Sequence, residues 1–313
     1  MTESIERCLR TDALVRGDGL ALAGALPAGC CDLIYLDPPF GTGARRRPLR
    51  GRGGRFRRVE AEGFADPRPE RASLSGWIEA LLIEGARLLR PGGALFLHLD
   101  WRSAHHARLA LERIFGPESF LNEIIWHYAT GGIPSAWFAR KHDTILYFRN
   151  GPGHTFHRLT ERKRLAHRMS RRGVEEFREG EDWYRYRALD DVWEIPWLTQ
   201  DARERTGYPT QKPLALLVRI LLAATDPGMR VADFCCGSGT TAVAARGLGR
   251  RWIACDPSAE AIRVAHARLD SMRPEDSEIR RAVASAVQPH PEIQSCPAAI
   301  LAPYRVVDWP IMK

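Results

Sequence analysis

The chain has 313 residues, and 44% of them are hydrophobic, so it can bury one large core or one core with a smaller lobe. No stretch reaches the roughly 18 to 20 apolar residues of a membrane helix, and the first ten residues lack the apolar centre of an export signal, which predicts a cytoplasmic protein without a membrane anchor. The excess of 46 Lys+Arg over 38 Asp+Glu gives a net charge of +8, which suits a polyanionic partner without proving one.

Apolar runs of strand length alternate with stretches of helical spacing along the chain. In chain order they predict strands at 14–16 and 32–36, a helix at 77–90, a strand at 94–99, a helix at 104–114, strands at 123–127 and 144–149, a helix at 213–224, a strand at 251–256 and a helix at 258–269. The pair at 123–127 and 144–149 is expected to form an antiparallel hairpin at the sheet edge. The tail from Pro274 has six prolines and no periodicity, so we expect it to be extended or partly disordered. The alternation itself predicts a parallel α/β sheet.

Cysteine and histidine usage argues against disulfides and metals. The seven cysteines include two adjacent pairs, a spacing that is typical neither of a disulfide framework nor of a zinc site. His98, His105 and His106 have no carboxylate or cysteine at ligand spacing. We therefore expect buried, reduced thiols and no metal.

Basic residues gather in two runs. Residues 43–59, GARRRPLRGRGGRFRRV, hold eight arginines, and residues 157–172 read HRLTERKRLAHRMSRR. Each run can be a solvated face or a surface for phosphates. The first run has too few apolar residues to order itself, so we expect it to be mobile in the free protein.

A glycine loop, GSGTTA at 237–242, follows a predicted strand and precedes a helix, and Asp256 ends the next strand. Glycines let a ligand approach the backbone, and an acidic residue at that place can hold a ribose. The pattern fits a dinucleotide, S-adenosylmethionine, or a plain strand–helix turn. Only about seventy residues follow the loop, too few for the second half of a dinucleotide domain, so further strands of the sheet must come earlier in the chain.

The stretch LIYLDPPFGTG, residues 33–43, puts a carboxylate, two prolines and an aromatic ring at the end of a buried strand. The exocyclic amine of a nucleobase is a poor nucleophile, because its lone pair is delocalised into the ring. The carboxylate of Asp37 and the adjacent proline carbonyl can accept hydrogen bonds from both of its N–H groups and stabilise the charge that develops as a methyl group arrives. The prolines fix that carbonyl, and Phe40 offers a face to an extruded base. We therefore predict the catalytic residues Asp37, Pro38, Pro39 and Phe40.

Six segments occur in an order that carries a family resemblance. They are GDGL, CDLIYLDPPFGTG, LLRPGGALFLHLDWR, IFGPESFLNEIIWHY, DVWEIPWL and GYPTQKPLALLVRIL. Over roughly residues 12–268 the chain resembles the amino-group DNA methyltransferases of the beta arrangement, in which the catalytic motif precedes the cofactor motif. The resemblance implies an α/β fold with a Rossmann-like, S-adenosylmethionine-dependent sheet, a circularly rearranged motif order and an inserted target-recognition lobe.

The resemblance also implies site residues. Cofactor contacts are expected at Asp18, Thr210, Gln211, Lys212, Asp233, Phe234, Cys235, Gly237, Ser238, Gly239, Thr240, Thr241, Asp256 and Pro257. Contacts with DNA are expected at Arg45, Arg46, Arg47, Arg50, Arg52, Arg55, Arg162, Lys163, Arg164 and Arg168. Two positions depart from the family pattern: Cys235 stands where phenylalanine is usual, and Gly41 stands where asparagine is frequent.

Four regions are expected: a catalytic half at 1–150, the inserted target-recognition lobe at 151–205, a cofactor-binding half at 206–272 and a C-terminal tail at 273–313. The implied activity is methyl transfer from S-adenosylmethionine to the N6 amino group of adenine in double-stranded DNA, in restriction–modification or epigenetic marking. Transfer to cytosine N4 and a catalytically silent DNA-binding subunit are the alternatives. In the family that the chain resembles, aspartate at the first position of the catalytic motif favours adenine as the target base. The intact Asp-Pro-Pro-Phe motif argues against a catalytically silent subunit. A homodimer and a cognate restriction endonuclease are partners that the sequence leaves open.

Overall fold

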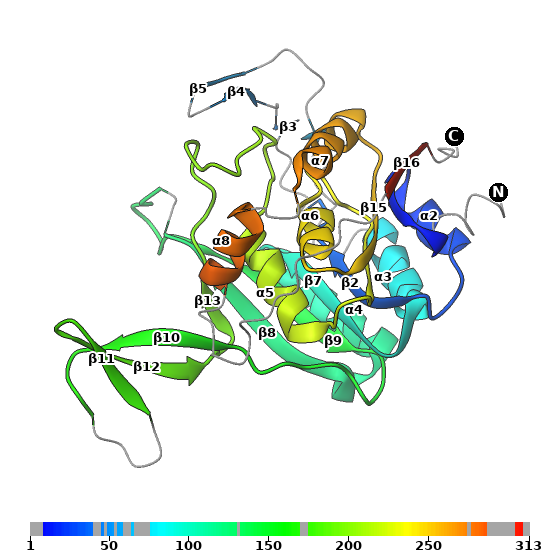
Figure 1. The fold of residues 1–313 in the computed structure, drawn as a ribbon. Helices are drawn as coiled ribbons and strands as arrows, with labels where there is room; N and C mark the ends of the chain where they lie inside the picture. Colours follow the sequence, from blue (N-terminus) through cyan, green and yellow to red (C-terminus); the bar gives the residue numbers. More distant parts are fainter. Residues whose placement is uncertain are drawn as a thin grey trace.

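The computed structural model describes residues 9–39, 45–46, 49–52, 55–58, 64–65, 76–129, 132–169, 175–273, 277–286 and 304–308. Its centre is a nine-stranded sheet with the strand order β13-β8-β9-β7-β2-β14-β15-β1-β16 (Figure 1). Within the described strands of this sheet, β9 pairs antiparallel with β7 and β8, and every other pair is parallel. The predicted α/β fold is confirmed, with one reversed strand.

The elements have the following bounds. The strands of the large sheet are β1 (Asp12–Arg16), β2 (Cys31–Leu36), β7 (Leu89–Leu99), β8 (Phe120–His127), β9 (His142–Arg149), β13 (Val192–Glu194), β14 (Arg230–Asp233), β15 (Arg251–Asp256) and β16 (Tyr304–Asp308). The helices are α2 (Gly19–Ala25), α3 (Gly76–Leu88), α4 (Ala104–Phe115), the short 3-10 helix η1 (Pro117–Ser119), α5 (Leu214–Ala224), α6 (Thr240–Gly247), α7 (Ala259–Ser271) and α8 (Ser277–Ala286).

Helices cover both faces of the sheet, so a central strand is buried on both sides. Helices α2, α3 and α4 pack in one apolar cluster, and α5 to α8 pack in the other. Strand β2 shows the consequence: Leu33 and Tyr35 enter the second cluster, and Ile34 and Leu36 enter the first. This two-sided burial is why the strand before the Asp-Pro-Pro motif is a continuous apolar run.

Two expectations about the sheet edges need correction. β8 and β9 do pair antiparallel, as predicted, but they are not at the edge, because β13 adds in parallel beside β8. The tail is expected to be extended or partly disordered. Among its described residues, β16 is an extended strand that pairs in parallel with β1 at the opposite edge, whereas α8 is a helix that packs on α5. The bare edge of β1 offers backbone groups to any short extended segment, and sequence periodicity does not detect such pairing.

A smaller sheet lies within residues 151–205. It has the order β10-β12-β11 and consists of β10 (Thr160–Leu165), β12 (Asp182–Ala188) and β11 (Glu176–Glu179). It extends away from the main body at the lower left of Figure 1. The division of the chain into four regions stays a prediction.

Part of the arginine-rich run forms short strands. β4 (Leu49–Arg52) and β5 (Arg55–Arg58) make an antiparallel hairpin, and β3 (Arg45–Arg46) pairs with β6 (Phe64–Ala65). The side chains of this run lie outside the described residues, and its mobility stays a prediction. No helix among the described residues has the length and apolarity to cross a membrane. The five cysteines that the structure describes are free thiols.

The sheet determines where loops from distant parts of the sequence meet. The carboxyl ends of β1, β15, β14, β2 and β7 all lie on the same side of the sheet, because these strands are parallel. We call this side, where the strands end, the carboxyl edge. β9 runs the other way, so its first residues reach that same edge. Ligands of such sheets bind in the crevice outside the carboxyl ends of the strands. We therefore expect the functional groups where the parallel strands end.

Gly19, the first residue of helix α2, packs closely against the backbone of Phe234. A Cβ built on Gly19 would lie 2.3 Å from the backbone oxygen of Phe234, whereas one on Gly24 meets nothing within 4 Å. We expect Gly19→Ala to destabilise the protein by about 1–3 kcal/mol, because backbone must move. Gly24→Ala, the matched control in the same helix, should stabilise it by up to about 1 kcal/mol. Urea unfolding of both variants measures this, and equal effects would contradict the packing.

Candidate active site at the carboxyl edge of the sheet

Four carboxylates stand at the carboxyl ends of neighbouring strands. Asp256 ends β15, Asp233 ends β14, Asp37 follows β2, and Asp18 follows β1. Asp18 caps helix α2, since its side chain accepts a hydrogen bond from the N–H of Ala21 at 2.8 Å. The edge is therefore acidic where four predicted site residues meet.

The glycine loop joins β14 to α6 through two left-handed residues. Gly237 has φ 48° and Gly239 has φ 74°, a region that favours glycine. A Cβ on Gly239 would lie 2.6 Å from the Cβ of Ala265, and one on Gly237 would lie 3.2 Å from the ring of Tyr208. Because these neighbours are protein atoms, the glycines by themselves do not identify a ligand.

Burial makes the loop carboxylates weak acids. It raises the pKa of Asp233 to about 7, and the charges of Asp37 and Asp256 add to the rise, although hydrogen bonds from Thr241 and Cys235 oppose it. Burial also raises the pKa of Asp256 to about 6. Its two oxygens accept hydrogen bonds from the N–H groups of Gly237 at 2.9 Å and Ser258 at 2.8 Å. Carboxyl oxygens at such an edge can accept hydrogen bonds from ribose hydroxyls, a group that S-adenosylmethionine and a dinucleotide share.

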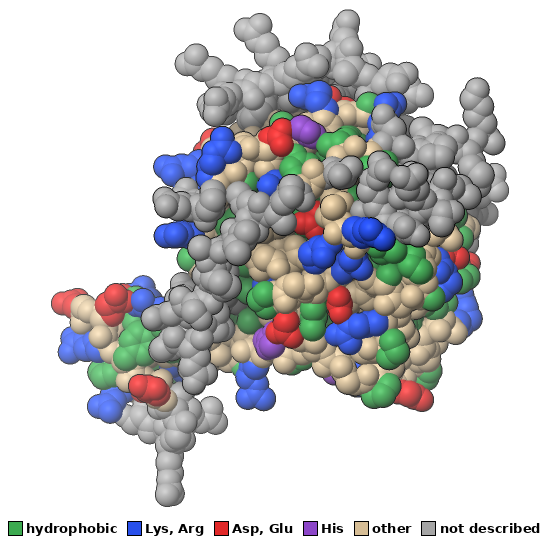
Figure 2. All heavy atoms as spheres, turned by 45° about the vertical axis from the view of Figure 1, so that its right-hand side comes forward, with side chains coloured by type: hydrophobic (Ala, Val, Ile, Leu, Met, Phe, Trp, Pro, Cys, Tyr) green, Lys and Arg blue, Asp and Glu red, His purple; other side chains and the backbone are tan. Residues whose placement is uncertain are grey.

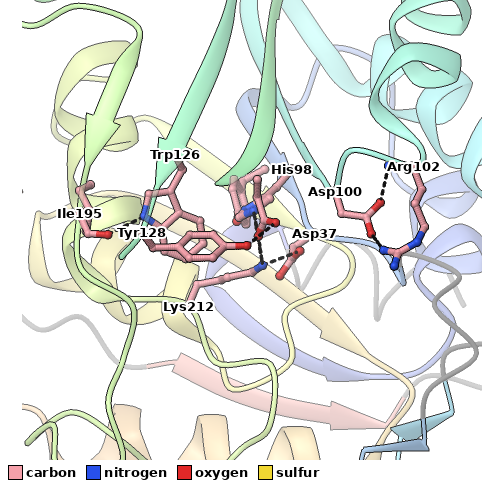
Figure 3. A network of polar contacts seen from close by, with 10 residues as sticks. Asp37, His98, Asp100, Arg102, Trp126, Tyr128, Ile195 and Lys212 are labelled. Atoms are coloured by element: carbon pink, nitrogen blue, oxygen red, sulfur yellow. Dashed lines mark hydrogen bonds and ion pairs between the residues drawn. The ribbon is translucent and has the colours of Figure 1, made fainter. Parts of the chain in front are cut away.

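A buried lysine faces Asp37, the predicted catalytic aspartate (Figure 3). The Nζ of Lys212 lies 3.2 Å from Oδ1 of Asp37 and 3.8 Å from Oδ2 of Asp143. It also lies 3.4 Å from Nε2 of His98. Lys212 is only 7% exposed, and a buried ammonium needs such partners. The ion pair links the segment before α5 to the predicted catalytic motif after β2.

Tyrosine and histidine side chains hold the second carboxylate of this cluster. Nε2 of His98 lies 3.1 Å from Oδ2 of Asp143, and the hydroxyl of Tyr128 donates to Oδ1 of Asp143 at 3.1 Å. The hydroxyl of Tyr35 lies 2.8 Å from the other ring nitrogen of His98. Burial opposes ionisation of Asp143, but the hydrogen bond and charge of His98, with the charge of Lys212, outweigh it and lower its pKa. Asp143 is thereby kept ionised beside the lysine.

Gln211, the residue before Lys212, connects the segment before α5 to neighbouring residues through hydrogen bonds. Oε1 of Gln211 accepts hydrogen bonds from the N–H and the hydroxyl of Thr206, at 2.8 and 2.7 Å. Its Nε2 donates to the carbonyl of Glu204 at 2.6 Å. The hydroxyl of Thr240 donates to the carbonyl of Lys212 at 3.3 Å, which joins this element to helix α6.

The remaining predicted cofactor residues surround the glycine loop. Phe234, Ser238, Thr240 and Thr241 are buried, Thr210 is half-buried, and Pro257 is exposed. Arg268 donates to the carbonyl of Ser238 at 3.0 Å and to the hydroxyl of Thr240 at 2.9 Å. Burial raises the pKa of the Cys235 thiol, so this group is neutral. These residues order the loop, and their contacts with a cofactor stay predictions.

Among the predicted DNA contacts, those whose side chains the structure describes lie on or next to the smaller sheet. Arg162 and Arg164 lie on β10 of the smaller sheet and pair with Glu179 and Asp182. Arg168 lies over the ring of Trp183, 5.1 Å from its centroid. On the face shown in Figure 2, basic side chains lie at several places rather than in one stripe. Phe40 and Arg47 lie outside the described residues, as do the side chains of Arg45, Arg46, Arg50, Arg52 and Arg55.

The sequence analysis did not predict four of the residues that surround Lys212: Tyr35, His98, Tyr128 and Asp143. The available signal was a polar group within an apolar strand, as in Tyr35 and His98, because such a group needs a buried partner. Within the described part of the chain, no three His, Cys, Asp or Glu side chains gather as a metal site.

Comparison with known proteins gives this geometry a context. A family model for DNA methylases matches residues 31–267. The DNA adenine methyltransferase YhdJ of Escherichia coli is 28% identical over 271 residues, which cover 82% of each chain. Among solved structures, the M1.HpyAVI complex with SAM has a TM-score of 0.53 at 18% identity and covers 82% of this chain and 99% of that one. The cytosine-N4-specific PvuII DNA methyltransferase has a TM-score of 0.55 at 14% identity, over 95% of both chains.

The raised pKa of Asp233 predicts how stability depends on pH. A carboxyl with an ordinary pKa of 3.8 and a folded pKa of about 7 contributes stability that is fully present below pH 4 and is lost as the pH rises through 7. Asp233→Asn should therefore flatten the pH dependence between 4 and 7, by on the order of 2–4 kcal/mol. Thermal unfolding across this range measures it.

The control is Asp201→Asn, because a hydrogen bond from Thr199 lowers the pKa of exposed Asp201 below that window. Parallel curves for Asp233→Asn and the wild type would contradict the assignment.

Proposed function

Since the chain belongs to the family of DNA methylases that act on N6 or N4 amino groups, we propose that it transfers a methyl group from S-adenosylmethionine to the N6 amino group of adenine in double-stranded DNA. The carrying observation is the carboxylate of Asp37 at the end of β2, beside the glycine loop and held by Lys212. Aspartate at this motif position and the similarity to a relative named as a DNA adenine methyltransferase support adenine.

Cytosine N4 is the second candidate, because the fold also occurs in an enzyme titled cytosine-N4-specific. Adenine and cytosine present the same chemical group, an amine conjugated with a ring. The acceptors that the motif offers serve either base, so the choice depends on the shape of the pocket around the ring.

The residues of the catalytic motif act on the amine. S-adenosylmethionine, when bound, supplies an electrophilic methyl group. Lys212 engages Oδ1 of Asp37, and the other carboxylate oxygen, Oδ2, accepts an N–H of the target amine in this proposal. The carbonyl of Pro38 is the acceptor for the second N–H. These hydrogen bonds strengthen as positive charge develops on the nitrogen, so they stabilise the transition state more than the ground state.

Around the glycine loop we propose cofactor contacts from the residues expected in the sequence. Asp256 is suited to the ribose hydroxyls, because each of its oxygens can accept a further hydrogen bond. Asp18, at the adjacent strand end, is suited to the adenine amine. The acidic edge favours the positively charged sulfonium.

For DNA we propose phosphate contacts from both basic runs. The pairs of Arg162 with Glu179 and of Arg164 with Asp182 lie on a solvent-exposed sheet. Exposed ion pairs contribute little, so phosphates can replace the carboxylates. The target-recognition lobe at 151–205, between halves at 1–150 and 206–272, and the tail at 273–313 remain our proposed division. A homodimer and an accompanying nuclease stay predictions.

Asp37→Asn keeps the shape of the side chain and removes its charge. Loss of one charged acceptor should lower the rate of methyl transfer by about 10²-fold or more. The measurement is transfer of labelled methyl groups to genomic DNA, followed by single-molecule sequencing to identify the base and motif. Asp226→Asn, at a half-exposed carboxylate paired with His157, should behave as the wild type. Near-normal turnover of Asp37→Asn would refute the catalytic role, and methylcytosine in the wild-type product would refute adenine.

Lys212→Met removes the ammonium and keeps the length of the side chain. If Lys212 acts by holding Asp37, kcat should fall at least about tenfold while the affinity for S-adenosylmethionine changes less than threefold. Calorimetric titration gives the affinity, and Lys212→Arg should restore part of kcat. A lost affinity with normal kcat would instead make Lys212 a cofactor contact, as the family resemblance implies.

A further inference from the structure

The loop of residues 132–140, between β8 and β9, exposes large apolar side chains. Ile133 is 93% exposed, Trp137 is 61% exposed and Phe138 is 98% exposed. Three such residues within six positions are costly to leave in water, and a concentrated patch of this kind marks an interaction site. The function proposed above gives this loop no role.

Hydrogen bonds place the base of the loop beside Asp37. The N–H of Tyr128 donates to the carbonyl of Lys141 at 2.9 Å, and Nζ of Lys141 donates to the carbonyl of Ala129 at 3.1 Å. The hydroxyl of Tyr128 donates to Asp143, which lies 3.8 Å from the ammonium that contacts Asp37. The loop therefore rises from the edge that carries the catalytic carboxylate.

Arginines lie among these aromatic side chains. The guanidinium of Arg140 lies 4.0 Å from the ring centroid of Trp101 and 5.7 Å from that of Trp137. Trp101 follows β7 and is 42% exposed. The guanidinium of Arg102 lies 4.8 Å from the centroid of the same Trp101 ring. Arg102 also forms an ion pair with Asp100 (Figure 3). A hollow of about 370 Å³ beside them is lined by Gly132, Ile133, Pro134, Trp137, Ala139 and Arg140.

This composition suits a nucleic acid. Aromatic faces stack on bases, and guanidinium groups bind phosphates, so the two kinds of side chain together match a chain of alternating rings and charges. The position adds a geometric requirement. A base that reaches Asp37 must leave the duplex, and the gap that it leaves lies next to whatever protein surface borders the mouth of the site.

We propose that the 132–140 loop enters the duplex and fills the space of the extruded target base, with Phe138 and Ile133 against the neighbouring bases and Arg140 on a flanking phosphate. Apolar side chains of DNA-bending proteins also enter the base stack, where they insert between adjacent base steps. The inference rests on the proposed function, since it requires DNA as substrate and extrusion of the base.

The test compares two substrates that differ only in the pairing of the target. Both are duplexes with the motif found by single-molecule sequencing; in one the target base is paired, and in the other it faces an abasic site. The double variant Ile133→Ala with Phe138→Ala should lose at least tenfold in kcat/KM on the paired duplex and less than threefold on the pre-opened one. Ile83→Ala, at an isoleucine on α3 that is 53% exposed, is the matched control and should equal the wild type on both.

Each other outcome is decisive. Equal losses on the two substrates would make the loop a general DNA contact and overturn insertion, and no loss on either would overturn any contact with DNA. Variants that remain folded by circular dichroism and fully active on the pre-opened duplex exclude a folding defect. A wild type that methylates neither substrate would refute the proposed function itself, and the inference with it.

Discussion

The buried ammonium of Lys212 between Asp37 and Asp143 is the interaction on which the candidate site depends. It draws together three elements that are far apart in sequence: the end of β2, the start of β9 and the residues before α5. A charge in such a place is stable only with its counter-charges, and removing one partner leaves another uncompensated. The same cluster therefore connects the predicted catalytic motif to the glycine loop, because the hydroxyl of Thr240 in α6 donates to the carbonyl of Lys212.

The reversal of one strand makes this cluster possible. In a wholly parallel sheet, the first residues of a strand lie at the edge opposite to the ligand site. β9 runs antiparallel to β7, so His142 and Asp143 lie next to the end of β7. The carboxylate of Asp143 consequently faces His98 and Lys212 and remains ionised. At the other end of the site, Asp233 and Asp256 are buried with raised pKa values. The site thus combines a charge-paired half around Lys212, which we propose for the amine, with a weakly acidic half around the glycine loop, which we propose for the cofactor.

The surfaces that we propose for DNA lie at the periphery of this centre. The smaller sheet carries basic side chains that are paired with carboxylates, whereas the 132–140 loop carries exposed apolar ones. Phosphate contacts orient a duplex without reading its sequence, and contacts with bases require groups that enter the stack or a groove. The two surfaces therefore differ in the chemistry that they offer to the same partner.

The fold class could be predicted from the sequence, and so could the two motifs that make up the candidate site. Two-sided burial makes β2 a continuous apolar run, and the Asp-Pro-Pro and glycine-loop motifs depend on local backbone chemistry. Features of both kinds can therefore be recognised in the sequence. Tertiary structure alone decided which polar groups meet. The contact of Lys212 with Asp37 and the approach of His98 to Asp143 join residues separated by 175 and 45 positions, and no local pattern records them. The pairing of β16 with β1 was missed for a related reason: an edge strand accepts a short segment through its backbone, which leaves little trace in the side chains.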